Sequence, residues 1–437
     1  MVSHTTLFQV ATAGLLAFGC FGSDFPIDRF GAKPDGSKCT AAFAAAFGAA
    51  ADAGGGRVVV PKGRWFTGAI RLKSNCELHL ECGAEVVFSD DLEDYIPGVP
   101  TSFEGVECVN VSPLVYAYGC TNVTVTGKGA LRAKMEFWWS WAGRRKPACE
   151  AANRVLKDEW APRRTPVEER QLWKLPGAEF RPPFLHFNRC VGVRLDGFAV
   201  RGTPFWTIHL FLCDGVAIRG LDVDAADGDG RMINNSDGID IEMSRNVDIS
   251  NCTFRQGDDA VVVKSGRDFD GRRLSTPTEN VVVSGCVVRA AHNLLAVGSE
   301  LAGGIRNVRV RDCRIVGPAE EVLFVKTNPR RGGFVENVVV EDVSACELRA
   351  AGERRGSVFA IDAMYWYGAP GEEPLEREYL TDIRGLTVRR VHARSAVRRL
   401  DLRGYGRRPP RDILIEDVSV DSCDEPDRLE NVMIRRQ

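Results

Sequence analysis

The sequence lacks any uninterrupted apolar run of the ~18 to 20 residues that a membrane-spanning helix requires, so we expect no membrane span. It also lacks an excess of charge of either sign, because 57 Lys and Arg residues stand against 59 Asp and Glu residues and leave a net charge of −2. The overall charge therefore gives no reason to expect nucleic acid or an anionic membrane as a partner. The sequence does not indicate an oligomeric state.

Cysteine is too sparse for a scaffold of disulfides, with 14 residues in a chain of 437. Four of them end a recurring segment: Cys252 in RNVDISNC, Cys286 in ENVVVSGC, Cys313 in RNVRVRDC and Cys346 in ENVVVEDVSAC. Free buried thiols pack as small apolar side chains. We expect these four to stay unpaired and to stack as one inward-facing ladder.

That recurring segment is the main organising signal of the chain. It consists of a polar residue, often Asn, then alternating apolar residues, then a turn with Gly, Asn or Asp. The steps between copies are irregular but stay within the range of solenoid repeats. The anchor residue of the clear copies falls at Val193, Val216, Val247, Val281, Val308 and Val338. Weaker copies have their anchors at Val123, Leu386 and Ile413.

Short strands of period two that recur in this way, separated by turns, predict the coils of a single-stranded parallel β-helix. We expect an all-β fold with one domain at 24–437 and a loop-rich insertion at about 137–182. The alanine-rich segment from Thr40 to Ala53 predicts a short N-terminal capping helix, with Thr40 as N-cap, Phe43 and Phe47 on one face, and Gly54 at its end.

The N-terminal segment 1–23 holds a short apolar core between small residues, which is typical of an export signal. Only His4 stands where the positively charged start of such a signal is expected. We expect a secreted or periplasmic protein, with an intracellular location as the alternative.

Acidic residues in the second half of the chain recur at a spacing close to one coil. Asp237 in NNSDGID lies about one short coil before Asp258 in QGDDA, and Asp259 follows directly. His292 in AAHN follows Asp258 by a longer step, and Lys326 in FVKT follows His292 by a step of equal length. On a β-helix these side chains would project from the same side of neighbouring coils and form the floor of one groove.

Carboxylates with separated pKa values suit the cleavage of a glycosidic bond, because one donates a proton to the leaving oxygen while another stays ionised to activate water. Asp beside Gly is also an ordinary turn residue, so a turn explains each acid taken alone. Their coincidence at coil spacing favours the catalytic interpretation. We expect neither a metal nor another cofactor.

In this order and on this repeat, NNSDGID, QGDDA and the segments around His292 and Lys326 resemble the motifs of family 28 of the glycoside hydrolases, the polygalacturonase family. FGAKPDG near residue 30 is similar to the N-terminal cap of that superfamily, so the resemblance covers most of the chain. It implies a right-handed parallel β-helix of the pectin-lyase-like type. It also implies that the partner is an acidic plant cell-wall polysaccharide or oligosaccharide.

The resemblance further implies an inverting hydrolase in which Asp258 is the general acid and His292 tunes its protonation. Asp237 and Asp259 would position and deprotonate the attacking water. Lys326 would hold a sugar carboxylate at the cleaved bond. Two further residues, Asn235 and Tyr365, are expected to contact the substrate nearby.

Segments 265–268, 298–300 and 326–328 resemble the exo-acting branch of the family, and long inserts at 137–182 and 266–279 would wall off one end of the groove. Arginines in these loops, among them Arg267 and Arg330, would make the groove locally positive. They are therefore candidates for binding an acidic chain.

Two positions depart from the family pattern: Phe324 stands where Arg is expected, and Asn293 stands where Gly is expected. Losing a guanidinium removes a bidentate contact to a carboxylate. The leading prediction is an exo-polygalacturonase-like enzyme that cleaves α-1,4-galacturonosyl linkages. The alternative keeps the fold and mechanism but acts on rhamnogalacturonan.

Two other classes stay open. A polysaccharide lyase would need a Ca²⁺-binding carboxylate cluster and a Lys or Arg base, and a non-catalytic solenoid would only bind carbohydrate. If the protein is intracellular, we expect it to act on imported oligosaccharides.

Overall fold

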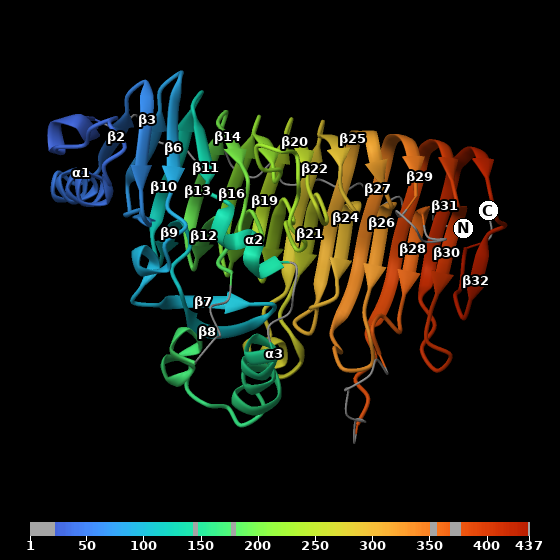
Figure 1. The fold of residues 1–437 in the computed structure, drawn as a ribbon. Coiled ribbons are helices and arrows are strands. Elements are labelled where there is room, and N and C mark those ends of the chain that lie inside the picture. The colour runs from blue at the N-terminus through green and yellow to red at the C-terminus, as the bar shows by residue number, and fades with distance from the viewer. Residues whose placement is uncertain (1–21, 143–146, 176–180, 350–355, 368–376, 436–437) are drawn as a thin grey trace.

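The computed structural model describes residues 22–435 except 143–146, 176–180, 350–355 and 368–376. The chain coils into one elongated, right-handed parallel β-helix (Figure 1), which confirms the predicted fold class. Within these described ranges, no helix is long and apolar enough to cross a membrane. Residues 1–21 of the predicted export signal lie outside the described part.

Two long parallel sheets form the solenoid, and we call the 19-stranded one sheet A and the 11-stranded one sheet B. Sheet A contains β1 Asp24–Pro26, β2 Gly56–Val60, β3 Gly63–Thr67, β5 Cys76–Leu80, β6 Ala84–Phe88, β10 Thr121–Gly127, β11 Ala130–Ala133, β13 Val191–Asp196, β14 Ala199–Arg201, β16 Asp214–Arg219, β17 Asp222–Asp224, β19 Arg245–Ser250, β20 Thr253–Arg255, β22 Thr278–Ser284, β23 Val287–Ala290, β25 Ile305–Ala319, β27 Phe334–Leu348, β29 Asp382–Ala396 and β31 Arg411–Cys423. Sheet B contains β4 Ile70–Arg71, β9 Val115–Tyr118, β12 Leu185–Asn188, β15 Ile208–Phe211, β18 Ile239–Glu242, β21 Val261–Lys264, β24 Asn293–Gly298, β26 Glu321–Lys326, β28 Ser357–Asp362, β30 Arg398–Arg403 and β32 Arg428–Glu430.

The remaining elements lie between these strands. An antiparallel hairpin joins β7 Val99–Phe103 to β8 Val106–Asn110. The α-helices are α1 Thr40–Asp52, α2 Glu136–Ala142, α3 Pro147–Arg154 and α4 Asp268–Leu274, and short helical turns are η1 Ile27–Phe30, η2 Leu92–Tyr95, η3 Val155–Trp160, η4 Val167–Glu169 and η5 Leu172–Lys174.

The anchor residues of the sequence repeat form one continuous row across sheet A. Strand partners in register run from Val123 through Val193, Val216, Val247, Val281, Val308, Val338 and Leu386 to Ile413. Every residue of this row is at most 3% exposed. A slip of one residue would turn the row toward solvent, so the apolar alternation fixes how each coil stacks on the next.

The asparagine that precedes the anchor has a structural role of its own. Asn280 donates from Nδ2 to Oδ1 of Asn246 at 3.1 Å, Asn307 to Asn280 at 3.1 Å, and Asn337 to Asn307 at 2.7 Å. These four residues have φ of 57° or 58°, a left-handed conformation that asparagine tolerates better than most residues. The ladder therefore satisfies amide groups at a turn that recurs from coil to coil.

The predicted cysteine ladder is correct for three members. Cys252, Cys286 and Cys313 are free and buried. Cys346 is also free, but its place in the ladder was wrong, because Cys313 pairs in register with Val343 and Cys346 lies three positions further along β27. Cys346 misses the ladder because it lies farther from its anchor Val338 than Cys313 lies from Val308, while the register between the two strands is unchanged.

The capping helix α1 covers the N-terminal end of the solenoid (Figure 1). Phe43 and Phe47 are each 1% exposed and belong to the main core, as predicted. The N-cap prediction was wrong. Cys39 is the N-cap residue, and Thr40 is the first helical residue, whose Oγ1 accepts a hydrogen bond from the Gly68 N–H at 2.8 Å. Thr40 thus binds a neighbouring loop instead of the helix end.

The inserts and the hairpin β7–β8 form a body beside the solenoid, which we call the side wall and define as residues 99–110, 147–175 and 268–274 (Figure 1). The insertion expected to be rich in loops contains α2, α3 and η3 to η5 instead. A buried ion pair joins the three parts: Arg170 Nη1 lies 2.7 Å from Asp270 Oδ2, and Asp270 also accepts from the Glu107 N–H at 3.0 Å. Because Arg170 is 1% exposed and Asp270 is fully buried, this contact holds the wall rigidly.

Strand β13 offers a matched test of the anchor row. Val193→Ala should lower the free energy of unfolding by about 2 kcal/mol, because it removes buried methyl groups and leaves a cavity. Val191→Ala on the same strand should change it by less than about 0.5 kcal/mol, because Val191 is 51% exposed. Urea unfolding followed by circular dichroism measures both, and equal effects would contradict the inward orientation of the row.

Candidate active site

The predicted acids lie in the turns that lead into neighbouring strands of sheet B. Asp237 precedes β18, Asp258 and Asp259 precede β21, and His292 precedes β24. The coils are bonded to each other at this level, because the Gly238 N–H donates to Asp259 O at 2.9 Å and the His292 N–H donates to Asp258 O at 2.8 Å. The structure therefore brings these acids and the imidazole together at one edge of sheet B.

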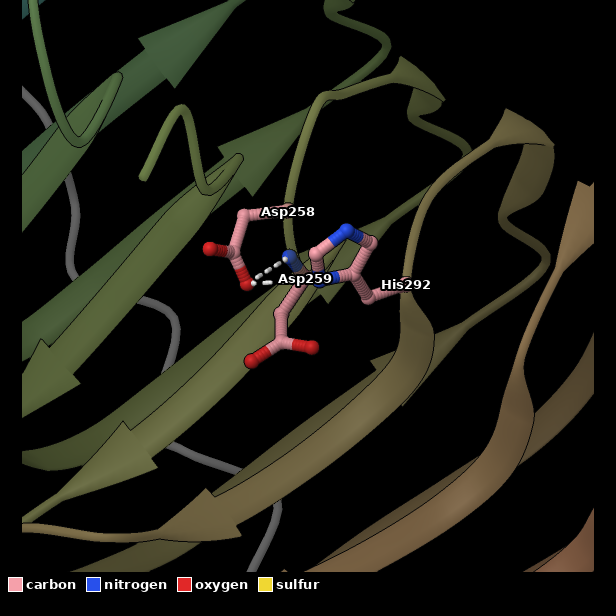
Figure 2. Close-up of side chains that lie close together, drawn as sticks. All are labelled: Asp258, Asp259 and His292. Carbon is pink, nitrogen blue, oxygen red and sulfur yellow. Dashed lines mark hydrogen bonds and ion pairs between the residues drawn. The ribbon is translucent and has the colours of Figure 1, made fainter. Parts of the chain in front are cut away.

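Asp258 and His292 are the partly exposed members of this group (Figure 2). His292 Nδ1 lies 3.3 Å from Asp258 Oδ1, and the same oxygen accepts from the Asp259 N–H at 3.0 Å. The His292 side chain is 44% exposed and the Asp258 side chain is 17% exposed. A substrate can therefore reach this pair from solvent.

The pair carries opposite charges in the free protein. Burial alone raises the pKa of the Asp258 carboxyl, but the hydrogen bond and positive charge of His292 outweigh burial and lower this pKa to about 2. Burial lowers the pKa of the His292 imidazole, and Asp258 outweighs that effect and raises it to about 9. Near neutral pH the proton of the pair thus resides on His292.

Glu320 is a neighbour that the sequence did not reveal. Its N–H donates to His292 O at 2.6 Å, and its Oε1 lies 3.8 Å from His292 Nε2. Glu320 is therefore the coil equivalent of His292, and it adds a second negative charge beside the imidazole. The equal steps along the chain had directed attention to Lys326 instead, which comes from the far end of β26.

Asp259 is fully buried and held by two side chains. Lys326 Nζ lies 2.8 Å from its Oδ2, and Asn293 Nδ2 donates to its Oδ1. Burial lowers the pKa of the Lys326 ammonium, but Asp259 outweighs this and raises it well above the ordinary value. Lys326 thus reaches the site, as predicted, with its ammonium already paired to a carboxylate. Asn293, noted in the sequence only as a departure from the family, orients the same carboxylate.

Asp237 and Asp240 are the carboxyls of the site that favour their protonated form. Asp237 is 3% exposed and Asp240 is fully buried. Burial first, and for Asp237 then the charge of Asp258, raises the pKa of both carboxyls well above the usual range. Within the described part of the chain, Oδ1 of Asp237 and both carboxyl oxygens of Asp240 have no hydrogen-bond partner. Asp240 was missed because one Asp in a strand of alternating residues carries no special signal.

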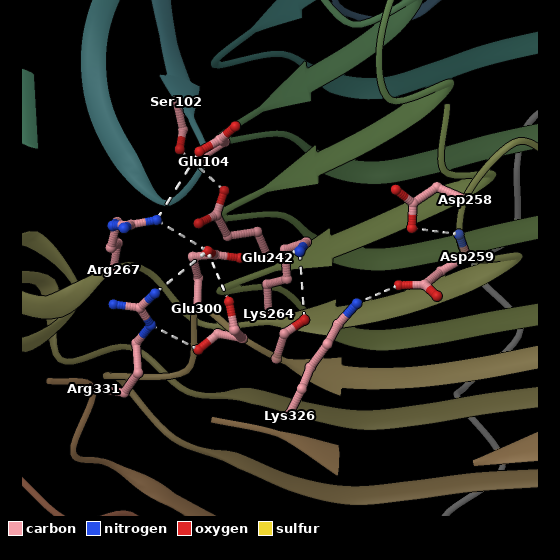
Figure 3. Close-up of polar contacts among 12 residues, drawn as sticks. Ser102, Glu104, Glu242, Asp258, Asp259, Lys264, Arg267, Glu300, Lys326 and Arg331 are labelled. Carbon is pink, nitrogen blue, oxygen red and sulfur yellow. Dashed lines mark hydrogen bonds and ion pairs between the residues drawn. The ribbon is translucent and has the colours of Figure 1, made fainter. Parts of the chain in front are cut away.

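A charged cluster connects the acids to the side wall (Figure 3). Lys264 Nζ lies 3.0 Å from Glu300 Oε2, and Arg267 Nη1 lies 3.4 Å from Glu300 Oε1. Burial raises the pKa of Glu300, but Lys264, Arg331 and Arg267 outweigh burial and lower it. The Arg267 N–H donates to Gly105 O in the β7–β8 turn at 2.9 Å, so the wall touches this cluster directly.

Glu242 and His209 form a buried pair behind the site. His209 Nε2 lies 2.9 Å from Glu242 Oε2, which also accepts from Ser102 Oγ at 3.0 Å. Burial raises the pKa of Glu242 to about 8 and lowers that of His209 to about 3, so both groups are neutral near pH 7. This agrees with a structural role for His209, and it ties hairpin strand β7 to sheet B.

Besides Lys326, four residues were predicted to bind substrate, and each has different contacts in the structure. Arg267 is paired within the charged cluster and its side chain is 21% exposed. Asn235 Oδ1 accepts from Arg181 Nη2 at 3.1 Å. The Arg330 N–H donates to Asn328 Oδ1 at 3.0 Å, and Tyr365 lies over Lys326. Their contacts with substrate stay predictions.

Asp258, Asp259 and His292 place one ligand atom each within 4.8 Å of the others, so we tested whether they fit a metal ion. An imidazole whose pKa is raised to about 9 is cationic near neutral pH and does not coordinate. Asp259 already binds an ammonium and an amide. These residues fit a proton-transfer site and do not fit a metal site.

Comparisons with known proteins agree with this geometry. The model of the family described as Glycosyl hydrolases family 28 matches residues 173–436. A hyperthermoactive exopolygalacturonase from Thermotoga maritima has 36% sequence identity and a TM-score of 0.83, over 94% of this chain and 90% of that chain. A family 28 exopolygalacturonase from Yersinia enterocolitica shares the fold, with 20% identity and a TM-score of 0.70 over 91% of this chain and 71% of that chain. A probable polygalacturonase from Vitis vinifera is 24% identical over 376 residues, which are 84% of this chain and 67% of that protein.

The charge state of His292 can be measured by NMR titration of its imidazole. The raised pKa predicts that His292 stays protonated between pH 6.5 and about 9, where an ordinary imidazole is neutral. Asp258→Asn should lower its pKa by about 1 to 3 pH units, because it removes the negative partner. Glu320→Gln should cause a smaller decrease, since Glu320 lies farther from the ring. A pKa that does not respond to Asp258→Asn would refute the ion pair.

Proposed function

The chain belongs to family 28 of the glycosyl hydrolases, and we propose that it is an inverting, exo-acting hydrolase that cleaves α-1,4-galacturonosyl linkages of pectic chains. The observation that carries the proposal is the convergence of Asp237, Asp258 and Asp259 with His292 on consecutive coils. The pKa values of two of its carboxyls are shifted apart, upward for Asp237 and downward for Asp258 beside His292, and the imidazolium of His292 holds the proton that the general acid needs. The inverting outcome rests on the family resemblance.

Asp258 is the general acid, and His292 is the reservoir of its proton. In the free protein, water around the partly exposed pair stabilises two separated charges. A sugar bound over the pair excludes this water and favours the neutral forms, so the imidazolium passes its proton across the 3.3 Å contact to Asp258. The carboxylic acid then donates this proton to the leaving oxygen.

Asp237 and Asp259 act on the attacking water from the neighbouring turns. Burial raises the pKa of Asp237, so this carboxyl first releases its own proton to solvent, and its ionised form is then a stronger base for removing a proton from water. Asp259, held in place by Lys326, orients the same water. Because, besides burial, the charge of Asp258 raises the pKa of both Asp237 and Asp240, we assign the acid limb of the activity to the group and not to one residue.

The side wall supports exo action. Its three parts are held by the buried pair of Arg170 and Asp270, and its hairpin turn bonds to Arg267 next to the charged cluster. We infer that this body closes the groove on one side of the acids and stops a chain from passing through, so that only a chain end binds. The 36% identical relative from Thermotoga maritima is named an exopolygalacturonase, which adds to this support.

The alternative substrate is rhamnogalacturonan, and Phe324 is the specific observation that favours it. At the position where the family has Arg, this chain has an apolar ring that is 4% exposed and makes no bidentate contact with a carboxylate.

We further propose export to the outside of the cell, where the protein would meet pectic polysaccharide. The alternative is that oligosaccharides are taken up and cleaved inside the cell.

Asp258→Asn tests the acid. We expect kcat on oligogalacturonate to fall by about 10² or more, because the leaving oxygen loses its proton donor. Asp248→Asn is the matched control, since Asp248 lies on β19 in sheet A, away from the acids, and its side chain is 40% exposed. Reducing-end release and anomeric NMR measure the rate and the configuration of the product. Retention of configuration would rule out the inverting mechanism.

The same assay separates the other classes. We expect full activity in EDTA. A product with the ultraviolet absorbance of an unsaturated uronate would instead establish a lyase. An Asp258→Asn variant with unchanged hydrolysis and unchanged carbohydrate binding would favour a solenoid that only binds.

Product length tests exo action. With an oligogalacturonate of five sugars as substrate, we expect single galacturonate units from the earliest time points, because the side wall admits only the chain end. Mass spectrometry of the products decides this. Early products of several different lengths from a longer polygalacturonate chain would show internal cleavage and contradict the role given to the wall.

A further inference from the structure

The turn after β28 exposes aromatic and apolar side chains next to the acids. Trp366 is 69% exposed and Met364 is 48% exposed, although large apolar side chains are normally covered. Tyr365 and Tyr367 between and beside them are partly exposed.

This turn is fixed to the coil that carries Lys326. The Tyr365 N–H donates to Thr327 O at 2.9 Å, and Asn328 Nδ2 donates to Tyr365 O at 3.0 Å. Both partners directly follow Lys326 in the chain. The position of Tyr365 and Trp366 relative to the site is therefore set by hydrogen bonds to the backbone and side chain of one coil.

Three rings form a continuous edge-to-face series that starts beside the acids. The centroids of Phe324 and Tyr365 are 5.8 Å apart at an interplanar angle of 85°, and those of Tyr365 and Trp366 are 6.1 Å apart at 90°. Lys326 Nζ lies 5.7 Å from the centroids of both Phe324 and Tyr365. Since Lys326 also contacts Asp259, the series leads from the catalytic carboxylates outward to solvent.

The charged groups around these rings are already paired. Lys326 pairs with Asp259, and Arg403 pairs with Asp362 at 2.9 Å. Asp362 is the strand partner of Lys326, so the next coil presents a carboxylate here. The strand partners of Phe324 are Ala296 and Ala360, which bring no charge. A sugar carboxylate on this side would meet aromatic rings, because Lys326 and Arg403 are already engaged by carboxylates of the protein.

We propose that Phe324, Tyr365 and Trp366 form a subsite for an uncharged pectic sugar, which stacks its apolar face on the exposed rings. Methyl-esterified galacturonate and rhamnose share the required chemistry, since neither carries a carboxylate charge. The subsite binds the sugar on one side of the cleaved bond, and the terminal sugar lies on the other side, toward the side wall. This inference rests on the proposed hydrolysis of pectic chains and names the substrate class more closely.

Binding measured without turnover tests the subsite separately from hydrolysis. Isothermal titration of the Asp258→Asn protein uses trigalacturonate, its methyl ester, and an oligosaccharide of alternating galacturonate and rhamnose. At least one of the two ligands with an uncharged sugar should bind about tenfold more tightly than trigalacturonate, and the comparison between them identifies the sugar. Trigalacturonate binding as tightly as both others, or no binding of any ligand, would overturn the subsite.

Two variants in the same background sharpen the test. Trp366→Ala should weaken binding of the preferred ligand by about tenfold and affect trigalacturonate less. Phe324→Arg should reverse the order of affinities, because it restores a guanidinium to the site. Met433→Ala is the matched control, since Met433 is 58% exposed in the last turn of the solenoid, far along the chain from the rings.

The result does not depend on one variant folding. Circular dichroism and thermal unfolding show whether each variant is folded. If Phe324→Arg is unfolded, the order of ligand affinities in the parent protein and the effect of Trp366→Ala decide whether the subsite exists. An unchanged ligand order in a folded Phe324→Arg protein, or an unchanged affinity in Trp366→Ala, would refute the subsite. Neither result bears on the acid role of Asp258, which the kinetic assay tests.

Discussion

The stacking of each coil on the next by backbone hydrogen bonds is the constraint on which the rest of the structure depends. It fixes Asp258 against His292 and Gly238 against Asp259 through main-chain contacts, before any side chain interacts. Loops of very different length leave and re-enter the coils without disturbing this register. The fold therefore holds the catalytic turns one strand spacing apart, while the inserts change the surroundings of the site.

Placing several carboxyls at one sheet edge is costly, and the structure offsets the cost in two ways. Lys326 and His292 supply positive charge to Asp259 and Asp258. Asp237 and Asp240 avoid charge by retaining protons, because burial raises their pKa. The same arrangement that makes the buried group tolerable thus sets the charge of each carboxyl: Asp258 is held ionised beside the imidazolium of His292, and Asp237 and Asp240 are held neutral by burial.

The sequence predicted the coils well, because the apolar residues that alternate along each strand are the same residues that are buried in the core. All nine anchors therefore fall in one row. It failed where spacing does not determine register. Glu320 took the place that the equal spacing had given to Lys326. It also failed for contacts between distant segments, such as Arg170 with Asp270, which are far apart in the chain and share no local pattern.

Specificity in this architecture can change without affecting the core, and Phe324 illustrates why. Leu323 and Val325 on either side of it are fully buried in the core, whereas Phe324 points to the opposite face of sheet B. Alternation along a strand separates the residues that stabilise a coil from those that meet the substrate. Replacing a guanidinium by a ring at the outward position therefore costs little folding free energy and changes the charge that the site offers to a sugar. For this chain the departure from the family pattern is thus more informative about substrate than the catalytic residues, which any linkage of this type would require.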